Sequence, residues 1–230
     1  RRAMRDLSTG SNNVAIGDYA FYASTTGCRN IAIGESAMAA GIVTGLDNIA
    51  IGTAAMDALT SGACNIALGI NALGASTTGC QNVAIGELAL GGAVTIGCQN
   101  IAIGISAMDA LTSGKWNVAL GPGALGASTT GCFNVAIGGG SPLGGVMIGI
   151  NNIAIGTSAA DAMTDADENV AIGNAALGAS TTGCRNIAIG TGALGGADTT
   201  GDDNIALGVY AGDALLAGTG NIAMGRHTLG

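Results

Sequence analysis

Cysteines are the residues of this sequence with the most reactive side chains, and five of the six share one position relative to a recurring Asn. These five lie two residues before that Asn: Cys28, Cys80, Cys98, Cys132 and Cys184. If successive repeats stack as neighbouring strands, Cys80 and Cys98 come to lie about 4.8 Å apart, which a disulfide can span. The alternative is that each cysteine acts as a small buried hydrophobe. Cys64 is offset by one position and is expected to face the other way.

Other residues that could support catalysis or metal binding are sparse. The sequence has no C-x-x-C, and the single His227 cannot complete a zinc ligand set. Asp165, Asp167 and Glu168 could offer oxygen atoms to calcium, but the Gly-Gly-x-Gly-x-Asp pattern of calcium-binding β-rolls is absent, so we interpret them as solvated loop charges. No Ser-His-Asp set recurs. We therefore expect no catalytic residue, no metal and no cofactor, and we predict that the chain is not an enzyme.

Charge argues against two classes of partner. The 230-residue chain carries 7 Lys and Arg against 15 Asp and Glu, a net charge of −8, and Arg1, Arg2 and Arg5 crowd one end. Binding to a phosphate backbone or an anionic membrane needs clustered basic residues, so neither nucleic acid nor a membrane surface is an expected partner. No apolar run reaches the roughly 18 residues that span a bilayer, so we expect no membrane insertion.

A short motif, Asn-[Ile/Val]-Ala-[Ile/Leu/Met]-Gly, recurs thirteen times at a nearly constant spacing. The thirteen copies begin at Asn13, Asn30, Asn48, Asn65, Asn82, Asn100, Asn117, Asn134, Asn152, Asn169, Asn186, Asn204 and Asn221. The steps between them follow a 17-17-18 rhythm, which gives a 52-residue superperiod. We interpret residues 1–230 as one repeat array, with 1–12 as a lead-in and 13–230 as the repeats, cut at both ends from a longer protein.

The motif alternates in the manner of a strand: its Ile, Val and Leu point to one side, and its Asn, Ala and Gly point to the other. Flanking glycines supply tight turns. We therefore predict an all-β fold, a parallel β-solenoid (β-roll or β-helix) of thirteen 17–18-residue repeats, which would form a rod about 60 Å long at ~4.8 Å per repeat. The recurring Asn either forms a structural ladder of side-chain amides or serves as a turn residue that tolerates the left-handed (αL) conformation.

Both sides of this strand are apolar, so both are expected to be buried. A coil that holds only one such repeat looks too thin to bury two sides by itself. Either several chains pack their Ile rows together, or one chain folds three repeats into each layer. In the second arrangement Cys28, Cys80, Cys132 and Cys184 would form a ladder with a spacing of about 4.8 Å. The sequence leaves both arrangements open.

The segments N-V-A-I-G and G-C-R-N-I-A-I-G resemble the head repeats of trimeric autotransporter adhesins, whose units carry a similar S-V-A-I-G core. They are also similar to the T-T-G-x-x-N-x-A-I-G-x-x-A-L repeats of phage tail-fibre and bacterial surface proteins. The resemblance covers the chain from about Leu7 to Gly230 and implies a left-handed parallel β-roll of three chains displayed outside the cell. The longer repeat, the cysteines and the 52-residue beat depart from the adhesin pattern.

Three functions follow as hypotheses. The first is a structural segment of an extracellular fibre or adhesin shaft, at the cell surface or on a virion, which would pair with itself as a homotrimer and could meet a cell-surface receptor. The second is an ice-binding or other surface-binding solenoid that uses the Thr found five residues before the Asn in nine copies, including Thr25, Thr60 and Thr77. Val43, Met147 and Leu216 interrupt this column and look half-buried. The third is a filament subunit that stacks end to end.

Overall fold

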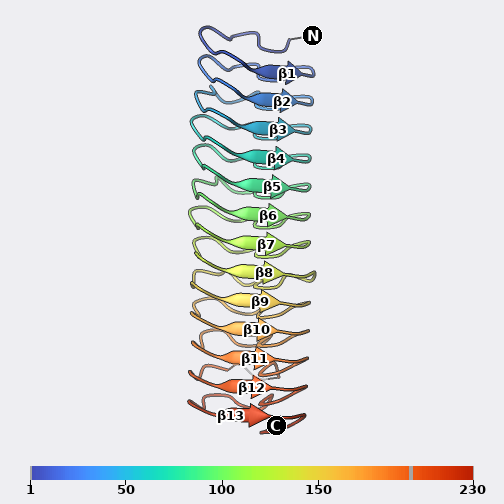
Figure 1. Ribbon diagram of the computed structural model, residues 1–230, viewed down its shortest axis with the longest axis vertical. Coiled ribbons are helices and arrows are strands. Elements are labelled where there is room, and N and C mark those ends of the chain that lie inside the picture. The colour runs from blue at the N-terminus through green and yellow to red at the C-terminus, as the bar shows by residue number, and fades with distance from the viewer. Residues whose placement is uncertain (1, 197–198, 230) are drawn as a thin grey trace. The chain divides into compact units, whose positions relative to one another are not determined.

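The structure, a computed structural model, describes residues 2–196 and 199–229. Within these residues it contains no helix and thirteen strands of three residues each, so the predicted all-β class is confirmed. The strands are β1 (Val14–Ile16), β2 (Ile31–Ile33), β3 (Ile49–Ile51), β4 (Ile66–Leu68), β5 (Val83–Ile85), β6 (Ile101–Ile103), β7 (Val118–Leu120), β8 (Val135–Ile137), β9 (Ile153–Ile155), β10 (Val170–Ile172), β11 (Ile187–Ile189), β12 (Ile205–Leu207) and β13 (Ile222–Met224) (Figure 1).

The chain divides into two compact units. Unit 1 (Arg1–Trp116) contains β1 to β6, and unit 2 (Asn117–Gly230) contains β7 to β13. The predicted single array of residues 1–230 includes residues 1, 197, 198 and 230, which lie outside the described residues.

Within each unit, every strand pairs in parallel with the strand of the next repeat, and the register never shifts. Between β1 and β2, for example, Val14 lies opposite Ile31 and Ala15 opposite Ala32. In unit 2, Ala171 of β10 lies opposite Ala154 of β9 and Ala188 of β11. One repeat therefore makes one rung, and the predicted parallel β-solenoid is confirmed, with a ~17-residue repeat.

The arrangement with three repeats in each layer is wrong. If it were right, each strand would pair with the third strand further along the chain, as β1 with β4, whereas β1 pairs with β2 and β2 with β3. The 52-residue superperiod thus spans three rungs and does not correspond to a layer. All rungs share the same core motif, so every pairing of repeats would satisfy the hydrophobic pattern equally well, and sequence periodicity alone could not distinguish the two.

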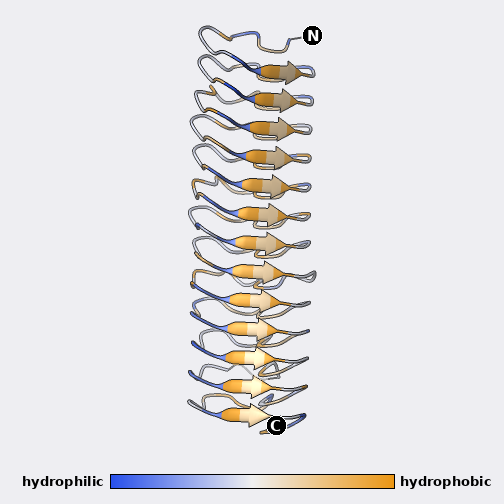
Figure 2. Cartoon of the chain, in the orientation of Figure 1, coloured by the Kyte–Doolittle hydropathy of each residue, from blue (hydrophilic) through white to orange (hydrophobic). Residues whose placement is uncertain are grey.

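The two sides of each strand have opposite environments. The central Ala points inward and is buried, as at Ala50 and Ala102, both with no exposed surface. The flanking aliphatic side chains point outward. Figure 2 shows the strands of each unit as an apolar row, yet Ile51 is 40% and Ile103 38% exposed. A coil with one repeat per rung therefore buries only one face by itself, as its thinness predicts, and the Ile rows that several chains were expected to pack together are exposed on the single chain. The coil has room inside for Ala and none for the larger residues on the other face.

A corner that follows each strand fills the core instead. In most rungs the backbone adopts positive φ six and eight residues after the recurring Asn, usually in non-Gly residues such as Ala54 (φ 54) and Met56 (φ 52). We call this segment the αL corner. It turns the chain sharply and places a large side chain inside: Met56, Leu73 and Leu90 are at most 1% exposed. A thin coil can therefore close around Ala on one side and Leu or Met on the other.

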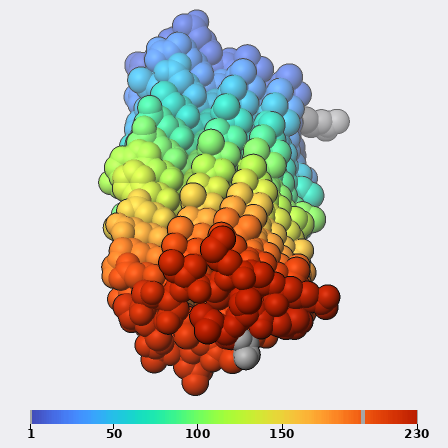
Figure 3. Space-filling view, turned by 60° about the horizontal axis from the view of Figure 1, so that its bottom comes forward, coloured from blue at the N-terminus to red at the C-terminus, as the bar shows by residue number. Residues whose placement is uncertain are grey.

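Glycine at the end of each strand permits the close stacking of rungs. Gly52 has φ 140, a conformation that L side chains rarely adopt. A Cβ at this position would also collide with the carbonyl oxygen of Gly69 in the next rung. Side chains at equivalent positions consequently line up in columns along unit 1, which runs from blue to green in Figure 3.

The expected lead-in already follows the solenoid pattern. The main-chain N–H of Met4 donates to the carbonyl of Ala20 at 3.1 Å, and that of Ser8 donates to Thr25 at 3.0 Å. Met4 also has φ 52, the value found at the αL corners. These residues therefore pair with the first complete rung before the first recurring Asn is reached.

Candidate functional site: the asparagine ladder and the surfaces around it

The recurring asparagines form a ladder of amides inside the coil. The main-chain N–H of Asn48 donates to Oδ1 of Asn30 at 2.9 Å, and Nδ2 of Asn48 donates to the same oxygen at 3.0 Å. Nδ2 of Asn48 also donates to the carbonyl of Gly62 in the following rung at 2.9 Å. The amide thus uses both of its N–H groups, and its oxygen accepts two hydrogen bonds from the next rung, so a strongly polar side chain is buried at little cost.

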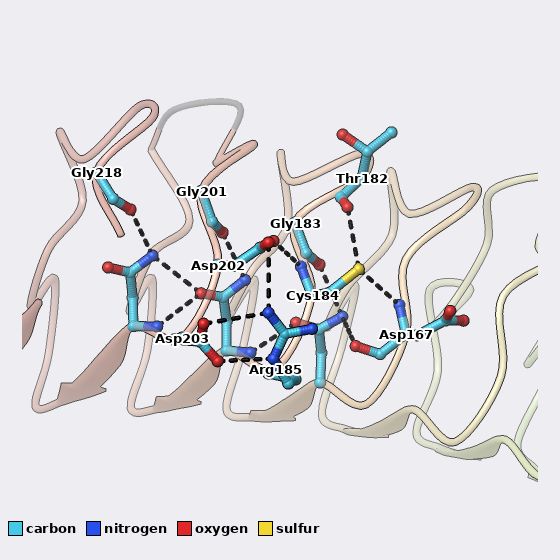
Figure 4. A network of polar contacts seen from close by, with 12 residues as sticks. Asp167, Thr182, Gly183, Cys184, Arg185, Gly201, Asp202, Asp203 and Gly218 are labelled. Carbon is cyan, nitrogen blue, oxygen red and sulfur yellow. Dashed lines mark hydrogen bonds and ion pairs between the residues drawn. The ribbon is translucent and has the colours of Figure 1, made fainter. Parts of the chain in front are cut away.

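The same geometry recurs in unit 2. Asn204 donates from its main chain and from Nδ2 to Oδ1 of Asn186, each at 3.0 Å, and from Nδ2 to the carbonyl of Gly218 at 2.7 Å. The carbonyl groups of Gly183, Gly201 and Gly218 stand in a row along this ladder (Figure 4). Eleven of the predicted residues are buried, and Asn13 and Asn221 are half-buried. Positive φ falls on the residue before each ladder Asn, as at Arg29 and Asp47, so the αL role belongs to that neighbour.

A second set of contacts between rungs lies outside the ladder, in the column formed by the residues two before each ladder Asn. We call it the outer column. Here a main-chain N–H donates to the side chain of the equivalent residue in the next rung. Ile150 donates to Oδ1 of Asp167 at 2.7 Å. Cys184 donates to Oδ1 of Asp202 at 2.9 Å, as Figure 4 shows. A side chain with an acceptor atom in this column therefore satisfies an N–H of its neighbour.

The five predicted cysteines all lie in this outer column, but the ladder of four at about 4.8 Å is wrong. Cys28 lies opposite Leu46 and Cys132 lies opposite Ile150, because each rung holds only one repeat. The cysteines of the 52-residue series are consequently separated by two intervening rungs. All six cysteines lie within the described residues, and none of the six forms a disulfide there. Cys64, offset as expected, is exposed.

Two arginines form paired contacts on the exposed side of the coil. Arg29 donates to both carboxylate oxygens of Asp47, at 2.6 and 2.8 Å. Arg185 does the same with Asp203, at 2.7 and 3.1 Å (Figure 4). Hydrogen bonds from the guanidinium group lower the pKa of the carboxyl groups of Asp47 and Asp203. Because both pairs are exposed, solvent screening leaves each a minor contributor to stability.

The Thr column proposed for ice binding is turned partly inward. Thr95 and Thr199 are buried, and Thr60 is half-buried with its hydroxyl donating to the carbonyl of Thr77 at 3.0 Å. Of the interrupting residues, Val43 and Met147 are fully buried, whereas Leu216 is 60% exposed. The exposed hydroxyls belong instead to the next residue along the chain, in the positions Thr26, Thr78, Thr130 and Thr182. Sequence alone did not distinguish these two adjacent columns.

Other candidate groups are dispersed. Among residues 2–196 and 199–229, no three His, Cys, Asp or Glu side chains are grouped to hold a metal ion. His227 stacks on Tyr210 with ring centroids 5.3 Å apart. Within the described part of the chain no pocket is present, and no helix there is long and apolar enough to cross a membrane.

The largest feature outside the ladder is an exposed apolar surface, made of the aliphatic rows that several chains were expected to pack together. We call it the strand face: the outward side chains at the first and third positions of every strand. They are half-buried or exposed in each rung, with Ile101 at 39% and Ile189 at 40%. A three-residue strand spans about 10 Å and six rungs about 29 Å, so the strand face of unit 1 covers roughly 300 Å². That is close to the largest apolar patch of an ordinary soluble protein.

These features define the chain as a parallel β-solenoid with one repeat per rung, an internal Asn ladder and an external aliphatic face. Searches with this chain found no matching protein family, no matching curated protein and no matching solved structure.

Proposed function

We propose that this chain is a structural segment of an extracellular fibre or adhesin shaft, at a cell surface or on a virion, whose task is to hold other parts at a fixed distance. The Asn ladder is the observation that carries the proposal. Within each unit, buried amides such as those of Asn48, Asn82 and Asn152 join three consecutive rungs through hydrogen bonds of 2.6 to 3.3 Å, so local bending breaks buried polar contacts. Leaving a buried polar group unpaired costs about 1–3 kcal/mol, which makes the stack stiff along its axis.

A spacer is tested by changing its length. Deletion of residues 31–82 removes three whole repeats and joins Asn30 to Val83, which preserves the motif and the register. We expect a folded chain that is shorter by about 14 Å, measured as the maximum dimension in small-angle X-ray scattering.

The matched control deletes residues 31–56, half of that length, which joins Asn30 to Asp57 and destroys the register. This variant should lose cooperative unfolding. A compact scattering profile for the parent chain, or collapse of the whole-repeat deletion, would contradict the spacer function.

The strand face supports a second part of the proposal, lateral association of copies of this chain as in a homotrimer. The rows of Ile and Val repeat at every rung, and a second copy presents the same spacing, so the rows can interdigitate along their full length. The roughly 300 Å² of one unit is well below the about 800 Å² per partner of a stable interface. Association should therefore strengthen as more rungs are aligned.

Ile51→Lys together with Ile103→Lys places two charges on the strand face. We expect these changes to abolish self-association in sedimentation velocity while the chain stays folded. Ile42→Lys is the control, because Ile42 is 59% exposed and lies outside the strands. A parent chain of single-chain mass at every concentration, or equal loss of association in the control, would refute the lateral contact.

A further inference from the structure

Among the five cysteines of the outer column, Cys80 and Cys98 alone occupy consecutive rungs. They lie three residues before β5 and β6, whose first residues, Val83 and Ile101, are paired in register. The main-chain N–H of Gln99 donates to the carbonyl of Cys80 at 3.0 Å, so the pairing extends to the cysteines. Residues opposed in this way are about 4.8 Å apart at Cα, inside the range of about 4.4–6.8 Å that disulfides span.

The two sulfur atoms lie on the same side of the coil. The main-chain N–H of Cys80 donates to Sγ of Cys98 at 3.4 Å, which places that sulfur against the rung of Cys80. Each thiol also lies near the carbonyl two residues before it, Cys80 at 3.5 Å from Thr78 and Cys98 at 3.8 Å from Ile96. Similar side-chain orientations in adjacent rungs stack one sulfur over the other.

We propose that Cys80 and Cys98 are a thiol–disulfide exchange site, which forms a reversible disulfide between two rungs of unit 1 when it meets a small-molecule disulfide. This modification is independent of the spacer function.

The contacts also assign an order to the two thiols. Cys98 Sγ accepts a hydrogen bond from the main-chain N–H of Cys80 at 3.4 Å. Burial raises the pKa of Cys80, and its hydrogen bond with Cys98 raises it further. Cys98 is therefore the thiol that reacts first, and Cys80 is the one that resolves the intermediate.

The exchange proceeds in two displacements. The Cys98 thiolate attacks one sulfur of oxidised glutathione, which forms a mixed disulfide and releases one glutathione thiolate. Cys80 then loses its proton to solvent and attacks Sγ of Cys98, which expels the second glutathione thiolate and leaves the Cys80–Cys98 bond. Two protein thiols are oxidised and one small-molecule disulfide is reduced to two thiols.

Incubation of the whole chain with oxidised glutathione, followed by mass spectrometry, tests the site. The parent chain should lose the mass of two hydrogen atoms, and cleavage at Glu87, which lies between the two cysteines, should leave the fragments joined until a reductant is added. Cys80→Ser should accumulate a glutathione adduct on Cys98, and Cys98→Ser should give no cross-link. Cys28→Ser is the matched control, because Cys28 has Leu46 opposite it and should leave the Cys80–Cys98 bond unaffected.

Three results would overturn the inference. One is the retention of six titratable thiols after the incubation, and a second is cross-linking only between chains. The third is a cross-link that disappears in Cys64→Ser, which would assign the bond to the exposed thiol of the preceding rung. If Cys98→Ser accumulates the adduct on Cys80 as fast as Cys80→Ser does on Cys98, the proposed order is wrong.

Discussion

The strand face and the αL corner are both built from aliphatic side chains, yet they treat them in opposite ways. The strand face uses mainly Ile and Val and leaves them half-exposed, as at Ile51 and Ile103. The αL corner uses Leu and Met and buries them completely, as at Met56 and Leu90. Burial therefore does not follow side-chain hydrophobicity in this chain, because the face that is rich in Ile and Val is the exposed one.

Backbone conformation explains the difference. In the αL conformation Cβ lies close to the following carbonyl, which costs about 1–2 kcal/mol per residue and is worst for β-branched side chains. Among the described residues, no Val, Ile or Thr has positive φ. Extended strands favour β-branched residues instead. The backbone conformation of each region thus determines whether it holds β-branched side chains. The size of the interior determines which region faces inward.

The largest expected effect is the difference in unfolding free energy between truncating a buried side chain of the αL corner and a half-buried one of the strand face. Leu90→Ala removes a fully buried side chain from an αL corner and should lower the free energy of unfolding by about 3 kcal/mol, because a cavity remains. Ile85→Ala removes a half-buried side chain of the strand face and should cost about 1 kcal/mol. Urea unfolding of both variants measures the two values. Equal losses would show that the strand face is as well packed as the corner.

The same substitution, Leu→Ile, should have different effects on stability in the two regions, because their backbone conformations differ. Leu90→Ile keeps the volume but places a β-branched residue at φ 51, so it should cost about 2 kcal/mol. Leu68→Ile makes the same change at the third position of β4 and should be neutral or slightly stabilising. The comparison fails if thermal unfolding shifts equally in both variants.

The smallest expected effect concerns the exposed ion pair beside the strand face. Arg29 lowers the pKa of the Asp47 carboxyl, so the stabilising contribution of the pair is complete above the unfolded pKa of about 3.9 and is lost as the pH falls through the lower folded value. At pH 6, Asp47→Asn should therefore unfold at a slightly lower urea concentration than the parent chain. At pH 2 the two chains should unfold at the same urea concentration. A difference that persists at pH 2 would mean that Asp47 acts by packing.

The sequence predicted the strands well because their signal is local. Alternation in Ile49-Ala50-Ile51 and a Gly on either side suffice to define a strand and its turns. The spacing also identified the recurring Asn, but it left the ladder and the turn role open, and the hydrogen bonds between rungs distinguish them.

Inside and outside could not be assigned in the same way, because Ala and Ile are both apolar. A usable signal was nevertheless present: Met38, Leu73 and Leu90 occupy a position that never holds Ile, Val or Thr, although these residues are abundant elsewhere. The absence of β-branched residues at this position indicates an αL backbone. An αL corner directly after a strand turns the chain, and the side toward which it turns is the interior. The adjacent Thr columns carried no comparable signal, since Thr recurs in both and aliphatic residues interrupt both, Val43 in one and Ile96 in the other.

The ladder also gives the stack a direction. Each Asn Oδ1 that has a partner in the ladder accepts hydrogen bonds from the rung that follows, as Asn30 accepts from Asn48 and Asn186 accepts from Asn204. The two surfaces of a rung are therefore chemically unlike: the one toward the preceding rung offers Asn N–H donors, and the one toward the following rung offers the Oδ1 acceptor together with one Nδ2 donor. Two arrays that continue one another must join head to tail, and growth by that contact would be polar, with one end taking up units differently from the other.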